Sequence, residues 1–565
     1  MNNDAKTFLT PELMDGRDWK GFELSVLRIL EHCGWENLQY VGGAGDLGAD
    51  ILGVRYNRQT QRFDSYLFQV KAVTGGDYVA THAIDEAVSA QGFYHCRIAV
   101  VVTNGDFRPA ALRRQIELNR LHFNLKLWNG LFLACLLSQY PERSSACREL
   151  RDYQREISDR VVSAYDAGER RGLFIVATGL GKTVIAADVV CRLFAKGLRR
   201  VLVLCHTNLL AIQLQRAFWG QVGRSMPTRL FLEGRTPVPI DGINFGLYQT
   251  VFGNLGGLPP GTFDLIVVDE AHHALARAFE VCLVHLRPRF LVGMTATPWR
   301  GDGRRLEQVF GSPLGRMSLV DGMARHFLAR VDYRLMNDNV NWEEVARLAH
   351  RRITVGDLNR RLFLPQRDDA VVSEIRRVMG EFRRPKVAVF SPSILHAERF
   401  ARLLTANGIR TGCVTSGSRR LAEKVLLDFS SDQLEAITTV DMLNEGIDVP
   451  DINILVFLRA THSRRIFVQQ LGRGLRMSKF KDHVVVLDFI SDVRRLALVA
   501  SFNGEVKKVG NSGDATVVFL KDGVVTSADP RFESFAEAWI HDVASLEDRT
   551  DAEKLEFPNI EELGL

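Results

Sequence analysis

The chain has 565 residues, of which 46% are hydrophobic and 25% are charged, and its formal net charge is +5. This length and apolar content suffice for three or four domains with their own cores. The eight cysteines include no Cys-x-x-Cys pair and the sequence shows neither a signal segment nor a membrane-length apolar window, so we expect a cytoplasmic protein without disulfides, zinc or membrane contact.

The charge is unevenly distributed along the chain. Residues 1–145 contain 15 Lys and Arg against 16 Asp and Glu, and residues 500–565 contain 6 against 14, which leaves 51 against 37 for residues 146–499. A basic middle segment between a neutral and an acidic flank fits a polyanionic partner that binds the middle of the chain.

Two short apolar segments near the N-terminus, residues 45–54 and 66–73, are predicted to form strands because they are short and rich in apolar or β-branched residues. Side chains alternate along a strand, so Gln69 and Lys71 share one face. An acid at the end of one strand, opposite a Gln-x-Lys on the next, is typical of a metal-assisted phosphodiesterase.

In that interpretation each polar residue has a role. Asp50 would bind Mg²⁺, Gln69 would offer its carbonyl oxygen to the same ion, and Lys71 would stabilise developing negative charge or orient water. Asp46 is an alternative metal ligand, although Asp50 matches the Gly-x-Asp pattern better.

This block resembles the Mrr-like branch of the PD-(D/E)xK restriction endonucleases, in which Gln often replaces the second acid. The resemblance implies that Glu23, on the amphipathic segment 22–30, is the acid of the family's first helix. It also implies a strand over 98–103 followed by a helix, and a closing strand and helix over 125–137. A neutral Gln is a poorer ligand for a hard cation than Glu, so an inert DNA-binding module of the same fold is the alternative.

A phosphate-binding loop is predicted within residues 173–188, where an apolar run ends in a glycine-containing turn before an apolar helix. The glycines let backbone N–H groups converge on an anion, the lysine adds charge for the β- and γ-phosphates of ATP, and the threonine hydroxyl can hold Mg²⁺. Val176 stands where the general pattern has its first glycine. The expected nucleotide contacts are Thr178, Gly179, Gly181, Lys182 and Thr183.

A second buried strand, residues 263–268, ends in paired acids. Phosphoryl transfer to water needs one carboxylate to hold Mg²⁺ and a second group to orient the attacking water. Asp269 and Glu270 are predicted to perform these two tasks.

Four further segments extend the pattern into a family resemblance. Residues 269–272 and 295–297 look like motifs II and III of superfamily 2 helicases and translocases, residues 439–450 resemble motif V, and residues 469–476 resemble motif VI. The sequence Asp-Glu-Ala-His-His at residues 269–273, together with residues 444–450, most resembles the motor subunits of type I and type III restriction enzymes.

The resemblance implies contacts with adenine and with the nucleic-acid backbone. Tyr153 and Gln154 look like the Q motif that reads adenine. The nucleic-acid contacts implied by the family's motifs are His206, Thr207, Gln249, Thr250, Ser391 and Asn444.

Motifs V and VI complete the implied ATP site. Gly446 and Asp448 of motif V belong to the nucleotide contacts. Arg473 and Arg476 of motif VI, three residues apart, would share one helix face and act as arginine fingers on the transferring phosphoryl group, an effect worth roughly 10³–10⁵ in rate.

We therefore expect an α/β protein in which a restriction-endonuclease-like domain precedes two RecA-like parallel-sheet lobes. The expected divisions are 1–140 for the nuclease, 148–300 for the ATP-binding lobe, 301–365 for an inter-lobe bridge, 366–497 for the C-terminal lobe and 498–565 for an acidic extension.

The function expected from these features is ATP-dependent translocation or unwinding of DNA, coupled to Mg²⁺-dependent endonucleolytic cleavage. The DNA is expected to be duplex. Bacterial restriction or anti-phage defence, with partner subunits, is the natural context of the resembling families. Two alternatives stay open. One is a repair-type remodelling ATPase with a catalytically inactive DNA-binding N-terminal domain, and the other is an RNA helicase with an accessory binding domain.

Overall fold

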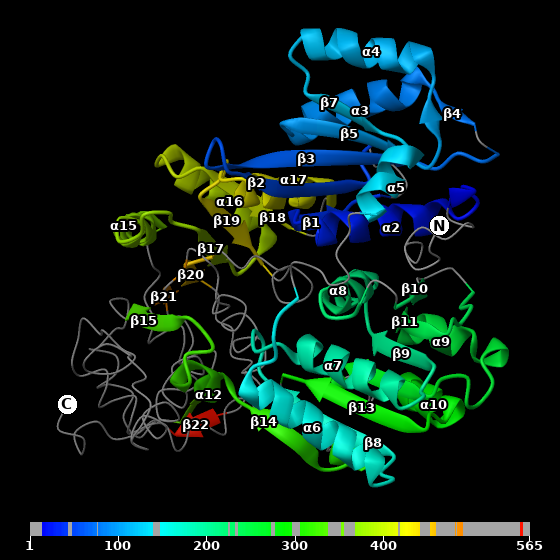
Figure 1. Ribbon diagram of the computed structural model, residues 1–565. Coiled ribbons are helices and arrows are strands. Elements are labelled where there is room, and N and C mark those ends of the chain that lie inside the picture. Colours follow the sequence, from blue (N-terminus) through cyan, green and yellow to red (C-terminus); the bar gives the residue numbers. More distant parts are fainter. Residues whose placement is uncertain are drawn as a thin grey trace.

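Over its described residues the protein forms three main sheets with flanking helices (Figure 1). The computed structural model describes residues 14–42, 48–75, 77–138, 147–223, 226–231, 236–272, 277–296, 306–336, 352–354, 368–415, 419–440, 452–458, 481, 483–489 and 554–556. Each main sheet belongs to one of the three predicted α/β units.

The first sheet is mixed, with strand order β1-β2-β3-β5-β7. Its strands are β1 (Glu36–Tyr40), β2 (Ile51–Asn57), β3 (Arg62–Lys71), β5 (Ile98–Thr103) and β7 (Leu125–Trp128). The first three strands pair antiparallel, and β3, β5 and β7 pair parallel. The strand expected over 45–54 is observed as β2 over Ile51–Asn57, because β2 pairs with β3 up to the turn between Asn57 and Arg62.

Helices cover both faces of this sheet because β3 is apolar on both of its faces. Tyr66 and Phe68 join the core that contains α2, whereas Leu67 joins the core that contains α3. The helices are α2 (Trp19–His32), α3 (Thr81–Tyr94), α4 (Pro109–Arg120) and α5 (Gly130–Ser138), and a two-stranded ribbon is formed by β4 (Tyr78–Val79) and β6 (Asp106–Phe107).

The second sheet has seven strands, all paired parallel, in the order β10-β11-β9-β12-β13-β8-β14. Its strands are mostly continuous apolar runs, as expected for a parallel sheet buried on both faces. They are β8 (Arg171–Val176), β9 (Arg200–Cys205), β10 (Thr228–Phe231), β11 (Gly242–Leu247), β12 (Leu265–Asp269), β13 (Phe290–Thr295) and β14 (Pro313–Met317). The surrounding helices are α6 (Asp152–Asp166), α7 (Lys182–Ala195), α8 (Asn208–Trp219), α9 (Tyr248–Gly253), η2 (Leu255–Gly257), α10 (Arg277–Leu286) and α11 (Glu307–Phe310).

The third sheet is also parallel, with six strands in the order β15-β21-β20-β17-β19-β18. Its strands are β15 (Arg330–Met336), β17 (Val387–Phe390), β18 (Thr411–Val414), β19 (Ala436–Thr439), β20 (Ile454–Phe457) and β21 (His483–Phe489). The helices that accompany it are α15 (Asp368–Met379), α16 (Ile394–Ala406) and α17 (Arg419–Ser430), whereas the short α12 (Leu319–Ala324), between β14 and β15, lies against Leu180 of the second unit.

The segment expected to bridge the two lobes, residues 301–365, is divided between the sheets over its described part. Strand β14 extends the second sheet beside β8, and β15 adds to the third sheet beside β21. A short strand, β16 (Arg352–Thr354), pairs antiparallel with β22 (Lys554–Glu556) from the acidic extension. The described part of the extension thus pairs with the segment expected to be the bridge.

The N-terminal domain packs on the ATP-binding lobe through α2 and α8, which lie side by side in Figure 1. Arg216 of α8 donates to Glu31 Oε2 at 2.7 and 3.0 Å and to the Leu38 carbonyl at 2.6 Å. Ile212 and Trp219 of α8 belong to the same apolar core as α2. This contact therefore combines buried apolar area with a charged hydrogen-bond pair.

The same domain also packs on the C-terminal lobe, through α17 (Figure 1). Leu427 of α17 joins the apolar core between the first sheet and α3. The Lys424 ammonium lies 5.6 Å from the centre of the Phe93 ring, and the Arg384 guanidinium lies 5.7 Å from that of Phe63. The N-terminal domain consequently contacts both lobes.

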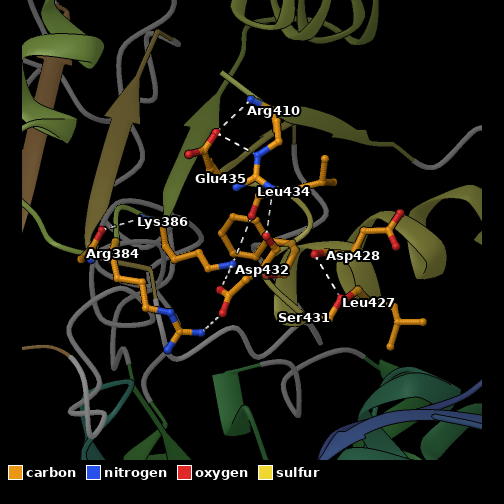
Figure 2. Close-up of polar contacts among 11 residues, drawn as sticks. Arg384, Lys386, Arg410, Leu427, Asp428, Ser431, Asp432, Leu434 and Glu435 are labelled. Atoms are coloured by element: carbon orange, nitrogen blue, oxygen red, sulfur yellow. Dashed lines mark hydrogen bonds and ion pairs between the residues drawn. The ribbon is translucent and has the colours of Figure 1, made fainter. Parts of the chain in front are cut away.

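The turn that follows α17 is tied to its own lobe by a charged network (Figure 2). Asp432, in the left-handed backbone region, accepts from Arg384 and from Lys386 Nζ, the latter at 2.9 Å. Arg410 donates to the Asp432 carbonyl at 3.1 Å and pairs with Glu435 at 3.3 Å. These contacts fix the C-terminal end of α17 relative to β17 and β18.

Candidate active sites

The predicted nuclease residues lie where β2 begins and β3 ends. The Asp50 backbone N–H donates to the Phe68 carbonyl at 2.9 Å, which continues the antiparallel register and sets Asp50 opposite Gln69. The buried Asp50 carboxylate accepts from the Val70 N–H at 2.6 Å. Sequence spacing alone predicted this juxtaposition of Asp50 with Gln69 and Lys71.

The Gln69 amide is fully buried and makes one hydrogen bond among the described residues. Its Nε2 donates to Glu86 Oε2 at 2.6 Å, and its Oε1 has no hydrogen-bond partner. Rotating the amide would bring two oxygens together, so Glu86 determines which end of Gln69 faces it. A buried carbonyl oxygen without a donor is costly by itself but suits a cation ligand.

Glu86, from α3, also holds Lys71, whose Nζ lies 2.8 Å from Glu86 Oε2. Burial acts to raise the pKa of Glu86, but the hydrogen bonds from Lys71 and Gln69 and the charge of Lys71 outweigh it, and the pKa lies below its ordinary value. Sequence reasoning missed Glu86. The available signal was an acid beside the small apolar residues Ala83 and Ala87 on the buried face of α3.

Glu23 borders the same region from α2. Its carboxylate accepts from the Tyr40 hydroxyl and lies 3.7 Å from Lys20 Nζ. A Cβ built on Gly42 would lie 3.1 Å from both Glu23 Oε2 and Asp50 Oδ1, so the two carboxylates face one small space. Only glycine leaves that space open.

These residues fit a hard cation such as Mg²⁺. Asp50, Glu23 and the Gln69 carbonyl provide only oxygen atoms, which is the donor type that Mg²⁺ prefers. Within the described ranges, no group of three or more His, Cys, Asp or Glu side chains is placed to hold a metal. The set of predicted ligands thus depends on Gln69 as well as on acids, and its binding of a metal stays a prediction.

The phosphate-binding loop joins β8 to α7. Gly179 and Gly181 have φ values of +87° and +82°, in the left-handed region that favours glycine. A Cβ on Gly181 would lie 2.5 Å from Gln154 Nε2, so this position also has no room for a side chain. Helix α7 begins at Lys182, and its first N–H groups have no acceptor within the helix. Thr178 is buried in this loop and Thr183 lies in the first turn of α7.

The Q-motif residues lie beneath this loop. The Tyr153 hydroxyl and Gln154 Nε2 donate to the Leu180 carbonyl at 2.5 and 2.9 Å, and Gln154 Oε1 accepts from the Arg151 N–H at 2.9 Å. Both side chains are buried. Their polar groups hold the loop in this structure, and the adenine contact expected from the resemblance stays a prediction.

The two motif II acids lie at the end of β12. Lys182 Nζ forms an ion pair with Glu270 Oε1 at 2.6 Å. Asp269 is buried, and its Oδ1 has no hydrogen-bond partner among the described residues. Burial raises the pKa of Asp269, and the neighbouring Lys182 opposes this increase. The orphaned oxygen fits the predicted Mg²⁺ ligand.

Motif II is linked to motif III through His272. Its Nδ1 lies 3.1 Å from Thr295 Oγ1 and 3.4 Å from Glu270 Oε2, and Thr295 Oγ1 donates to the same Glu270 oxygen at 3.5 Å. Glu270 has a positive φ of 46°, which a non-glycine residue adopts at a cost. These contacts hold the water-orienting candidate in one position.

The predicted nucleic-acid residues differ in exposure. Thr207 caps α8 by accepting from the Leu210 N–H at 3.2 Å. His206, the residue before Thr207, is half-buried. Gln249 is exposed on α9, while the Thr250 hydroxyl beside it is buried.

Ser391, the predicted motif IV contact with nucleic acid, is fully buried, and its hydroxyl lies 3.2 Å from His396 Nδ1. Its contact with nucleic acid stays a prediction. The remaining predicted residues lie outside the described part of the chain, namely Asp46, Thr297, Asn444, Gly446, Asp448, Arg473 and Arg476.

Comparison with protein families assigns the three parts. Residues 14–137 match the family model described as restriction endonuclease, residues 148–300 match type III restriction enzyme, res subunit, and residues 370–478 match helicase conserved C-terminal domain. The chain joins a restriction endonuclease domain to a helicase motor. The resemblance inferred from the motifs is therefore confirmed for the nuclease–helicase fusion.

Two relatives and one solved structure agree with this assignment. The type I restriction enzyme EcoAI endonuclease subunit of Escherichia coli is 26% identical over 459 residues, covering 71% of this chain and 56% of that subunit. The DNA 3'-5' translocase XPB2 of Sulfurisphaera tokodaii is 23% identical over 363 residues, covering 58% of this chain and 79% of that translocase. The nuclease–helicase fusion spans about half the length of the first curated relatives it matches.

The structure of the ATP-dependent Type ISP restriction-modification enzyme LlaBIII bound to DNA shares the fold. Its TM-score is 0.53 at 16% identity, covering 96% of this chain and 42% of that one. The predicted α/β fold class, with a restriction-endonuclease-like domain before two parallel-sheet lobes, is confirmed.

None of the helices in the described ranges combines the length and apolar character of a membrane span.

Proposed function

We propose that the nuclease–helicase fusion hydrolyses ATP to move along duplex DNA and cleaves that DNA with its N-terminal domain, in bacterial restriction or anti-phage defence. The observation that carries this proposal is the assembly of two separate polar sites in one chain. One site brings Asp50 opposite Gln69, and the other pairs Lys182 with Glu270 beside Asp269.

In the nuclease site, Asp50 and the Gln69 carbonyl would hold Mg²⁺, which supplies a Lewis acid for the phosphodiester when bound. Lys71 would stabilise the negative charge that develops on the phosphate. Glu86 acts as a positioning residue, because it orients the Gln69 amide and holds Lys71 Nζ. A phosphate that enters the site would compete with Glu86 for Lys71.

In the motor, the phosphates of ATP would compete with Glu270 for Lys182. Release of this 2.6 Å ion pair would free the Glu270 carboxylate to orient the attacking water. Thr295 and His272 keep a second Glu270 oxygen in place during that exchange. Asp269 and the Thr183 hydroxyl would hold the Mg²⁺ that accompanies ATP.

The packing of the nuclease supports coupling between the two sites. Its domain contacts α8 of one lobe through Arg216 and α17 of the other lobe through Leu427. Relative movement of the lobes during ATP hydrolysis would have to strain or break one of these contacts. The motor segment, with 51 basic against 37 acidic residues, would supply most of the DNA affinity.

A plasmid cleavage assay with Mg²⁺ tests this proposal, with and without ATP and on methylated and unmethylated DNA. We expect cleavage by the parent protein, none by Asp50→Ala, and loss of the ATP-dependent part in Lys182→Ala. ATPase activity stimulated by duplex DNA without cleavage would instead favour the remodelling ATPase with an inactive N-terminal domain. Stimulation by RNA but not by duplex DNA would favour the RNA helicase.

A further inference from the structure

A hollow of about 400 Å³ opens on the nuclease domain, away from the site built by Asp50 and Gln69. Its walls come from Trp35 just before β1, from β2 and β3, from Gln115 of α4, and from β7 and α5. Tyr66 in the wall and Gln69 in the nuclease site are three residues apart on β3, so they point to opposite faces of the strand. The hollow is therefore a separate site.

Aromatic rings form much of its lining. Trp35 meets Tyr66 and Trp128 edge to face, with ring centroids 5.6 and 5.8 Å apart. Trp128 lies 5.0 Å from Phe132, whose side chain is 42% exposed. The exposed phenyl ring of Phe132, backed by the buried rings of Trp35 and Trp128, offers a face on which a planar ring can stack, and such surfaces bind nucleobases irrespective of their sequence.

Two cations stand in the same lining, on exposed side chains. The Arg55 guanidinium lies 4.3 Å from the centre of the Trp35 ring, and Lys126 projects from β7. Neither forms an ion pair with any residue that the structure describes. The acid nearest in register to Arg55, Asp64, is bound instead by Arg97 at 2.6 Å and Asn57 at 2.8 Å.

One polar group in the lining has no partner among the described residues. The Trp35 indole N–H is buried without an acceptor, and the residue as a whole is 7% exposed. A buried donor left unsatisfied costs about 1–3 kcal/mol. A ligand that brought an acceptor atom to this N–H would relieve that cost.

We infer that this hollow binds one nucleotide, with its base on the aromatic wall and its phosphate on Arg55 and Lys126. The volume lies at the lower end of the roughly 300–1,000 Å³ of ligand pockets, which suits a single nucleotide and not a duplex. Arginine favours phosphate because its donors form a planar fork. The nucleotide comes either from solution or from a base extruded out of DNA, and both sources share this chemistry.

Binding measurements with the full chain, without Mg²⁺ or ATP, separate these sources and do not depend on cleavage. The probes are dCMP, a duplex with one unpaired extrahelical cytosine, and the same duplex fully paired. The variants are Phe132→Ala and Arg55→Gln. The matched controls are Phe123→Ala and Arg58→Gln, which replace exposed residues outside the hollow.

We expect both test variants to weaken binding of the extrahelical duplex by at least about fivefold, the lower end of what one stacked base contributes. The paired duplex and both control variants should be unaffected. Loss of dCMP binding alone would also support the hollow and would assign it to free nucleotide. Equal weakening of paired and extrahelical duplexes, or no change with any probe, would overturn the inference.

Discussion

Replacing Glu86 with alanine should impair DNA cleavage far more than it destabilises the nuclease domain. The Lys71–Glu86 pair is partly solvated, with side chains 39% and 32% exposed, so solvent screening limits its contribution to about 1 kcal/mol at most. The hydrogen bond to Gln69 adds about 0.5–1.5 kcal/mol. The total is small beside the roughly 5–15 kcal/mol that stabilise a folded domain.

Cleavage should respond differently, because Glu86 orients a metal ligand. Removing such a partner typically lowers metal affinity or activity by about 10- to 100-fold. We therefore expect the Mg²⁺ concentration for half-maximal plasmid cleavage to rise by about 10- to 100-fold in Glu86→Ala. Glu86→Gln keeps an acceptor for Gln69, so its Mg²⁺ concentration for half-maximal cleavage should lie between those of the parent protein and of Glu86→Ala. Asp85→Ala is the matched control, since Asp85 pairs with Arg114 on the exposed side of α3.

Two results would refute this reasoning. Faster cleavage by Glu86→Ala at every Mg²⁺ concentration would show that the carboxylate restrains Lys71 and does not position the site. An unchanged Mg²⁺ dependence, with thermal unfolding also unchanged, would show that Gln69 needs no support from α3.

The other predictions concern the two active sites and their interface. Glu270→Gln should abolish DNA-stimulated ATP hydrolysis but retain ATP binding, because the loop and Asp269 remain; turnover at the parent rate would mean that another group orients water. Asp50→Ala should lose Mg²⁺-dependent cleavage while its DNA-stimulated ATPase stays at the parent level, and persistent cleavage would point to a different nuclease site. Arg216→Ala should lower ATP-dependent cleavage and spare ATPase, since it removes contacts between nuclease and motor; equal loss of both activities would indicate general misfolding.

Motifs that are contiguous in the chain were predictable from sequence. The loop that ends at Lys182 and the strand that ends at Asp269 carry their own geometry, because strand, turn and helix propensities act over neighbouring residues. Alternation along β3 likewise placed Gln69 and Lys71 on one face. The mixed sheet then set Asp50 across from Gln69 through an antiparallel register that short-range pattern also implies.

Contacts between distant segments were not predictable in this way. Glu86 reaches Lys71 and Gln69 from a helix on the other side of a β–α connection, and no spacing rule relates them. The burial of Ser391, whose hydroxyl lies against His396 of α16, likewise depends on packing that the motif does not encode. The contact of the nuclease with both lobes depends on domain packing, which sequence periodicity does not encode.

In the proposed function, ATP hydrolysis moves a tethered nuclease along DNA. The direct measurement is ATP-dependent cleavage of a long linear duplex, with and without a tightly bound protein roadblock at one defined position. If the nuclease is carried by translocation, the roadblock should shift cleavage to the side on which the motor starts and lower cleavage beyond it. Lys182→Ala should abolish both patterns. Identical cleavage positions and rates with the roadblock in place would contradict translocation and show that ATP only gates a nuclease already bound at its target.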